Sequence, residues 1–177
     1  MRLALASVAV LGVGAAITTA AWTDQAWFTA EASTAHVELY GALAVDGVCP
    51  SADPDLYDEA DDLAGAVQIT LASGSFAGLV PGDERAVGIC LFNGATVPLS
   101  VSLGAPDLTD DPLFGGADPA DLEVQVAGAA FATQTLAANT VLPLDVVVTT
   151  PDPWSDEMQD QTSGVIELVF TGSTDLP

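Results

Sequence analysis

The sequence predicts an all-β protein, an antiparallel β-sandwich of about seven to eight strands. Short segments in which apolar and polar residues alternate recur along the chain, and this period of two is typical of strands with one buried face. Loops rich in glycine, proline and aspartate separate these segments. No segment keeps the apolar spacing of an amphipathic helix for more than a turn or two.

Residues 1–20 are expected to be a secretory signal peptide that precedes the fold. Met1-Arg2 gives a short positive start, an apolar run follows at Leu3–Ile17, and small residues come next, so we expect cleavage near Ala20 or Ala21. The run is short for a bilayer span, which needs about 20 apolar residues. An uncleaved anchor is the alternative. Cleavage would leave no stable membrane insertion, and the secreted protein would reach the extracellular matrix or the cell surface.

The 177 residues suffice for one domain with a sizeable core, which we place at residues 36–177. The composition is strongly acidic: 25 Asp and Glu residues stand against Arg2 and Arg85, and lysine is absent. Such a surface repels nucleic acid and anionic lipid headgroups, so neither is expected as a partner. It suits divalent cations, a cationic partner or solubility in high salt, and the simplest interpretation is a solvated acidic surface.

The first strands of the domain follow a segment without a pattern. Residues 21–35 mix aromatic side chains with polar residues and lack a clear period, so we set them apart as an N-terminal arm. A first strand is predicted at Val37–Val45, where the alternation is sharp, and Asp46-Gly47 ends it. The acidic stretch Ser51–Asp62 is too polar for the core and leaves room only for a short helix. Val67–Leu71 alternates again and is the second predicted strand.

A central β-hairpin is predicted in the middle of the domain. Its strands are Val87–Leu91 and Val97–Leu103, in which apolar residues alternate with smaller or polar ones. Asn93-Gly94 between them favours a type I′ turn, because both residues tolerate positive φ. Pro98 faces outward in this pattern and places the return strand near a sheet edge or a bulge. Upstream of the hairpin, Pro81-Gly82 suits a type II turn.

The C-terminal half predicts three further strands. Residues 105–121 contain prolines and adjacent glycines and are expected to form a long loop. Strands follow at Leu122–Val126 and Leu142–Val148, where apolar residues alternate with others. After a second acidic loop at residues 152–161, the segment Gly164–Thr171 is rich in β-forming residues and closes the domain.

Cys49 and Cys90 are expected to form a disulfide bond, because an exported protein meets an oxidising compartment. The bond would close a loop of about 40 residues and stabilise the fold by roughly 4 kcal/mol by restricting the unfolded chain. Two unpaired buried thiols are the alternative. A zinc site is disfavoured, since there is no second cysteine cluster and His36 is the sole histidine.

Several short motifs resemble, in their order along the chain, those of the TasA/camelysin family. The leader and Thr19–Asp24 look like the export signal of the SipW-type signal peptidase, in which small residues at the cleavage site run into an aromatic residue, Ser or Thr, and Asp. The downstream motifs are Leu79–Asp83, Phe92-Asn93-Gly94 leading into Val97-Pro98-Leu99, Leu142-Pro143-Leu144, and Asp160-Gln161 before the closing strand.

The resemblance implies a jelly-roll subunit of extracellular matrix fibres, exported through a SipW-type signal peptidase and partnered by copies of itself. In such fibres the mature N-terminal segment leaves its own subunit and adds a strand to the next one, and a head-to-tail contact of this kind propagates. On this chain the donor strand would be the arm, with Trp22, Asp24, Trp27 and Phe28 as assembly residues. The alternative is that these aromatic residues pack on their own domain or belong to a free arm.

Catalysis is not expected, although camelysin-like relatives have been described as metallopeptidases. Metal-assisted peptide hydrolysis needs about three protein ligands, usually including histidine, and a nearby general base. The chain offers His36 alone and no His-Glu-x-x-His sequence. A serine or cysteine nucleophile would lack a well-supported base for the same reason, and nothing selects a carboxylate pair for glycoside hydrolysis.

A monomeric calcium-binding or adhesin-type surface module is the remaining alternative. The first acidic stretch offers hard oxygen ligands for calcium, and no other cofactor is expected. The spacing is not that of an EF-hand, because its sixth position lacks glycine and no glutamate closes the loop. The candidate ligands are Asp53, Asp55, Asp58, Glu59, Asp61 and Asp62.

Overall fold

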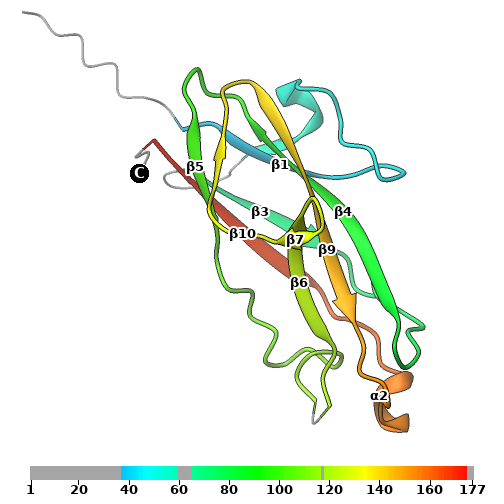
Figure 1. Cartoon of the computed structure of the whole chain (residues 1–177). Coiled ribbons are helices and arrows are strands. Elements are labelled where there is room, and N and C mark those ends of the chain that lie inside the picture. The colour runs from blue at the N-terminus through cyan, green and yellow to red at the C-terminus, as the bar shows by residue number, and fades with distance from the viewer. Residues whose placement is uncertain (1–36, 60–64, 117, 175–177) are drawn as a thin grey trace, which may run out of the picture. The chain divides into compact units, whose positions relative to one another are not determined.

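The fold consists of two antiparallel β-sheets packed face to face, which confirms the predicted all-β sandwich (Figure 1). The computed structural model describes residues 37–59, 65–116 and 118–174. The chain divides into two units, residues 1–34 and residues 35–177, and all the described residues belong to the second unit.

The described strands form one six-stranded and one four-stranded sheet. The six-stranded sheet has the order β2 (Asp58–Glu59), β1 (Leu39–Leu43), β4 (Glu84–Asn93), β9 (Thr140–Thr149), β6 (Asp121–Val126) and β7 (Ala129–Ala130). The four-stranded sheet has the order β3 (Ala66–Leu71), β10 (Ile166–Ser173), β5 (Leu99–Leu103) and β8 (Gln134–Leu136). The loops contain a 3₁₀ turn at Pro54–Leu56 and the one-turn helix α2 at Asp156–Gln159. Neither of these described helices is long and apolar enough to cross a membrane.

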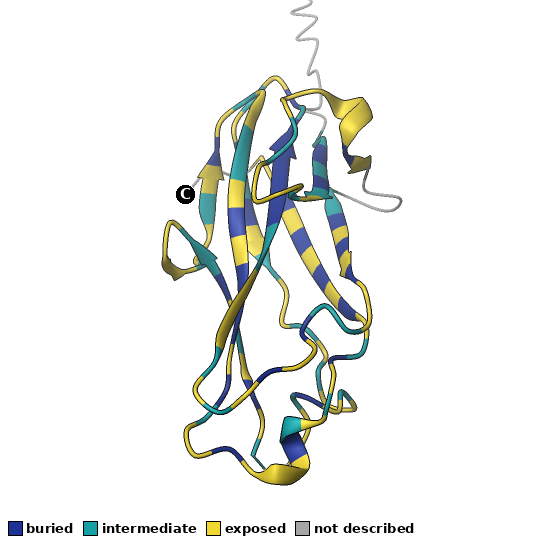
Figure 2. Ribbon diagram, turned by 90° about the vertical axis from the view of Figure 1, so that its right-hand side faces the viewer, coloured by how far each residue is buried: buried dark blue, intermediate teal, exposed yellow. Residues whose placement is uncertain are grey.

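The core lies between the sheets and is built by strand alternation. In β10, Ile166, Leu168 and Phe170 are fully buried while the residues between them are exposed, and Figure 2 shows this banding along the strands. Ile89 and Leu91 of β4 belong to the same core cluster and are fully buried as well. Burial of one such side chain contributes about 1.5–3 kcal/mol, so these rows hold the two sheets together.

The central strand β4 is buried on both faces, because the segment after β1 covers the outside of its sheet. Cys90 and Phe92 alternate with the core residues of β4 and form a second apolar cluster with Tyr57. The ring centroids of Tyr57 and Phe92 are 5.3 Å apart. The predicted disulfide is confirmed: Cys49 and Cys90 are joined by a bond that spans 41 residues of sequence. The disulfide fastens the segment between β1 and β2, which we call the covering segment, to β4.

The predicted central hairpin is wrong. The strand β4 pairs with β1 and β9, whereas β5 lies in the other sheet between β10 and β8. Asn93 and Gly94 are absent from the described residues with positive φ, so they form no type I′ turn. Gly94 is needed for space instead, because a Cβ there would lie 2.7 Å from Cε2 of Tyr40. Pro98 lies just before β5, which is near an edge of the four-stranded sheet as predicted, because its outer neighbour is the edge strand β8.

The side chain of Asn93 turns the chain from one sheet to the other. It is fully buried, and its oxygen accepts a hydrogen bond from the backbone N–H of Ala95 at 2.9 Å. Its amide nitrogen donates at 3.0–3.1 Å to three backbone carbonyls, those of Val97, Leu136 and Ala137. The corner after β4 is therefore held by one polar side chain that also ties it to the end of β8.

The type II turn at Pro81-Gly82 is confirmed. Gly82 has φ +76°, and the N–H of Asp83 donates to the carbonyl of Val80 at 3.0 Å. Thr150, just after β9, anchors this turn. Its buried hydroxyl donates to the carbonyl of Val80 at 2.7 Å and accepts from the N–H of Asp83 at 2.9 Å.

A tight turn of the I′ kind occurs at Asp46-Gly47, where the sequence indicated only the end of a strand. Both residues have positive φ, at 52° and 74°. Val45 and Val48 exchange two backbone hydrogen bonds of 3.0 Å across the turn. Three strands escaped prediction, β2, β7 and β8, because two or three residues are too few to establish a period.

Candidate functional site

The strand β10 has a partner along only half of one side. On the side toward β3, β10 is paired over most of its length. On the side toward β5, β10 is paired over Phe170–Ser173 only. Just after β5, the N–H of Gly104 donates to the carbonyl of Val169 at 2.9 Å, and the loop after β5 then leaves the sheet. No described strand continues this pairing to Glu167. Among the strands that the structure describes, none occupies the position beside the first half of β10.

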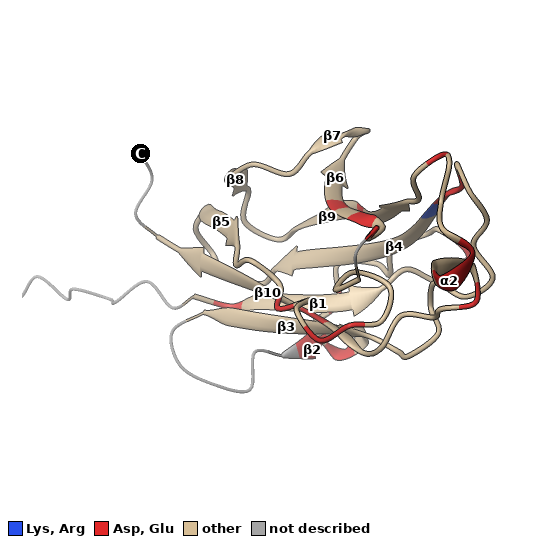
Figure 3. Cartoon of the chain, turned by 90° about the horizontal axis from the view of Figure 1, so that it is seen from below, with Lys and Arg blue, Asp and Glu red and all other residues tan. Residues whose placement is uncertain are grey.

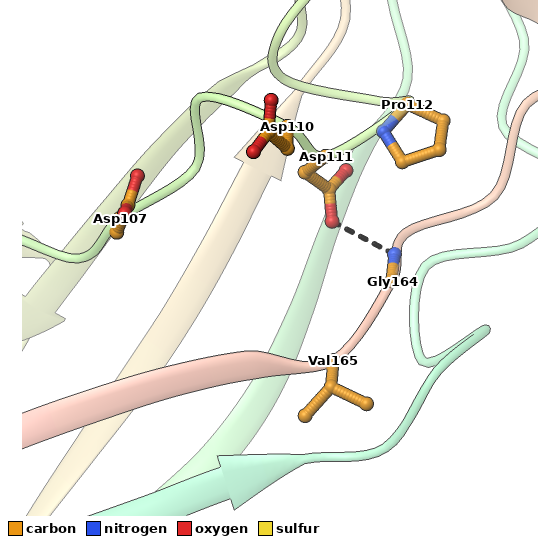
Figure 4. A pocket seen from close by; sticks show the side chains of 6 residues that line it. All are labelled: Asp107, Asp110, Asp111, Pro112, Gly164 and Val165. Carbon is orange, nitrogen blue, oxygen red and sulfur yellow. Dashed lines mark hydrogen bonds between the residues drawn. The ribbon is translucent and has the colours of Figure 1, made fainter.

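A hollow lies beside this unpaired half, with a volume of about 300 Å³. We name it the β10 trough, and its lining residues are Ala105, Pro106, Asp107, Val165, Glu167 and Val169. A hollow of about 270 Å³ adjoins it and shares Asp107 and Val165 with it (Figure 4). Another, of about 430 Å³, shares Ala105 and Pro106 with it. The trough thus continues along the loop that replaces β5.

Carboxylates hold the loop after β5 in place. In the loop after β5, Asp111 accepts hydrogen bonds of 2.8 Å from the N–H groups of Leu113 and Gly164, and the second bond ties the loop to the residues before β10 (Figure 4). Hydrogen bonds from the backbone and the hydroxyl of Thr109 lower the pKa of Asp107. Asp107 is therefore charged at neutral pH and stays so in mild acid.

The described part of the chain contains one basic side chain, Arg85 on β4, shown in blue in Figure 3. Its guanidinium donates to the carbonyl of Ala77 at 2.6 Å and lies 3.9 Å from a carboxylate oxygen of Asp83. The acidic side chains at the β10 trough consequently face no basic side chain from the described residues.

The strand β3 forms an edge of the four-stranded sheet. It pairs with β10 on one side, and no described strand lies on its other side. Its sequence, AVQITL, holds neither a charged residue nor a proline, although both are usual protections of an exposed edge. Gln68 and Thr70 are its exposed residues. The four strands of this sheet contain a single acidic residue, Glu167.

The residues predicted for export and assembly lie outside the described residues, and so does the sole histidine, His36. Cleavage near the end of the leader and a donor strand in the arm therefore stay predictions. The residues concerned are Ala20, Ala21, Trp22, Asp24, Trp27 and Phe28.

The candidate calcium ligands are spread over three places: Asp53 and Asp55 at the 3₁₀ turn, Asp58 and Glu59 in β2, and Asp61 and Asp62 outside the described residues. Asp53 caps the 3₁₀ turn, because its Oδ1 accepts from the N–H of Asp55 at 3.2 Å. Nowhere in residues 37–59, 65–116 and 118–174 do three His, Cys, Asp or Glu side chains gather as a metal site requires. Calcium binding here stays a prediction.

Sequence reasoning missed the β10 trough. Alternation marked Val165–Val169 as part of a strand, but the pattern of one strand does not tell how far its neighbour runs beside it. The one available signal was the run of prolines and glycines after Leu103, which indicates where β5 ends.

No protein-family model matches the chain, and neither does any curated protein or any solved structure.

Proposed function

We propose that the chain is a secreted, non-catalytic structural protein, a subunit of extracellular matrix fibres that assemble head to tail. In this proposal residues 21–35 of one copy, with Trp27 and Phe28 among them, leave their own subunit and add a strand to the jelly-roll sandwich of the next. The motif resemblance to the TasA/camelysin family supports the proposal. The disulfide supports the export step, because such bonds persist in oxidising compartments.

The unprotected edge of β3 is the observation that favours assembly most. An edge strand presents a row of unpaired backbone N–H and C=O groups, and proteins usually blunt it with charge, proline or a bulge. The edge at Ala66–Leu71 has six β-compatible residues and neither charge nor proline. A strand from a neighbouring copy would satisfy those backbone groups, and its apolar residues would extend the sandwich core.

Negative-stain electron microscopy of the secreted protein starting at Ala21, beside a version without residues 21–34, tests this function. We expect filaments from the longer form alone. Filaments from both forms would support self-assembly into fibres but exclude residues 21–34 as the donor strand. Monomers from both, across salt and calcium concentrations, would overturn self-assembly and favour the monomeric adhesin or calcium-binding module.

A pair of lysine variants tests the edge itself. Gln68→Lys places a charge on the exposed face of the edge strand and should abolish or strongly shorten the filaments. Ser100→Lys is the matched control, because it adds the same charge to the same sheet on β5, which has neighbours on both sides. Equal filament yields from the two variants would exclude the β3 edge as the acceptor.

A further inference from the structure

The backbone of β10 offers a strand-pairing edge at Glu167. In an antiparallel sheet, successive residues direct their N–H and C=O groups to opposite neighbours. Gly172 bonds to Gly65, on the β3 side, at 2.8 Å, and Val169 bonds to Gly104, on the β5 side, at 2.9 Å. The backbone N–H and C=O groups of the even-numbered residues of β10 therefore point toward β3. Those of Glu167 point to the opposite side, into the position beside β10 that β5 does not reach.

The side chains around this edge can pack against an added strand. Val165, just before β10, and Val169 within it flank Glu167, and they are 57% and 39% exposed. Ala105 and Pro106 form the facing wall of the trough. Since Val169 already bonds to Gly104, the open stretch runs from Val165 to Leu168 and is about 13 Å long at the rise of a strand, enough for about four residues of an extended peptide.

The charge at the trough selects the kind of peptide. Asp107 and Glu167 both line it, and no basic side chain of the described residues neutralises them. A strand with lysine or arginine would complement these carboxylates. The chain itself cannot supply such a strand after cleavage of the leader, because it has no lysine and its remaining arginine, Arg85, lies within β4.

We propose that the β10 trough binds an extended basic peptide segment of another protein as an added β-strand. The backbone of the peptide pairs with Glu167, its small or apolar side chains lie against Val165 and Val169, and its basic side chains approach Asp107 and Glu167. This site differs from the β3 edge used in the proposed fibre, on the other side of β10, and it requires no self-assembly.

Fluorescence anisotropy with the secreted protein and a labelled peptide, Lys-Thr-Val-Lys-Val-Thr-Lys, tests the proposal. We expect saturable binding at low salt, together with a shift of the backbone amide resonance of Glu167. A peptide N-methylated at every residue keeps the charges but has no backbone N–H left to pair with a strand edge, so it should not bind. Equal binding of the N-methylated peptide would overturn strand addition, and the lack of binding by the unmodified peptide would overturn the site.

Charge-neutral variants locate the site. The double variant D107N/E167Q should weaken binding about tenfold, through the loss of two exposed charge pairs. Glu123→Gln on β6, in the other sheet, is the matched control and should bind as the unaltered protein does. An equal loss in the control would show general attraction to an acidic surface and would overturn the proposal.

Discussion

Replacement of Asn93 tests whether one buried side chain joins the two sheets at the corner after β4. Asn93→Ala removes two N–H donors and one acceptor that serve Ala95 and three carbonyls. At about 1 kcal/mol for each of these two donors and this one acceptor, the loss is about 3 kcal/mol, and the buried groups left without a partner raise it toward 5 kcal/mol. This is a large part of the 5–15 kcal/mol typical of a folded domain.

Urea unfolding followed by tryptophan fluorescence measures this loss. Trp154 is 4% exposed and reports on the folded sandwich, and replacement of Trp22 and Trp27 by phenylalanine makes it the only tryptophan. Ser100→Ala, on the outward face of β5, is the control and should change stability by less than about 0.5 kcal/mol. A loss below about 1 kcal/mol in Asn93→Ala would refute the structural role given to this side chain.

Asn93→Asp sharpens the test through its pH dependence. The variant keeps the acceptor for Ala95 but turns a carboxylate toward three carbonyls, so the pKa of the new acid is raised in the folded state. A raised pKa means that the folded state binds the proton more tightly, and stability should therefore increase as the pH falls from 7 to 4 relative to Asn93→Ala. Parallel pH profiles of the two variants would contradict the carbonyl contacts.

Three further predictions concern the covering segment and the core. Reduction of Cys49–Cys90 should lower the free energy of unfolding by about 4 kcal/mol, given the 41-residue separation, and urea titration with and without reductant measures it. Burial raises the pKa of the Tyr57 phenol, so the contribution of Tyr57 to stability should be constant below about pH 10 and fall above it, and Tyr57→Phe should remove that part of the alkaline loss in unfolding measured at pH 9 and 11. Gly41→Ala should cost about 1–3 kcal/mol, because its Cβ would lie 2.7 Å from Cγ1 of Ile69, and a smaller cost in an Ile69→Ala background, which lacks that atom, would confirm the contact.

The strands of the core were predictable because each buries one face, and burial of one face leaves a period of two in the sequence. Val67–Leu71, Leu122–Val126 and Leu142–Val148 were all predicted as strands and lie in β3, β6 and β9. The disulfide was predictable because the chain contains only two cysteines. The type II turn at Pro81-Gly82 followed from the local backbone preferences of its two residues.

Strand pairing was not predictable in the same way. Asn93-Gly94 has the local preference for a hairpin, but β4 pairs instead with β1 and β9, and its two faces are buried in two different apolar clusters. The carbonyls that bind the Asn93 side chain come from residues more than 40 positions away as well as from Val97. Tertiary contacts therefore outweighed the turn preference.

The sequence by itself determined the fold class, the positions of the core strands, the disulfide and the strongly acidic charge, since each of these follows from composition or from residues close together in the chain. Only the tertiary structure decided which strands pair and that, among the described residues, β3 has no neighbour on one side and β10 has none beside Glu167. The physical reason is that an open strand position depends on where a neighbouring strand stops. The period of a strand records which of its faces is buried, whereas its backbone hydrogen bonds leave no trace in its side chains.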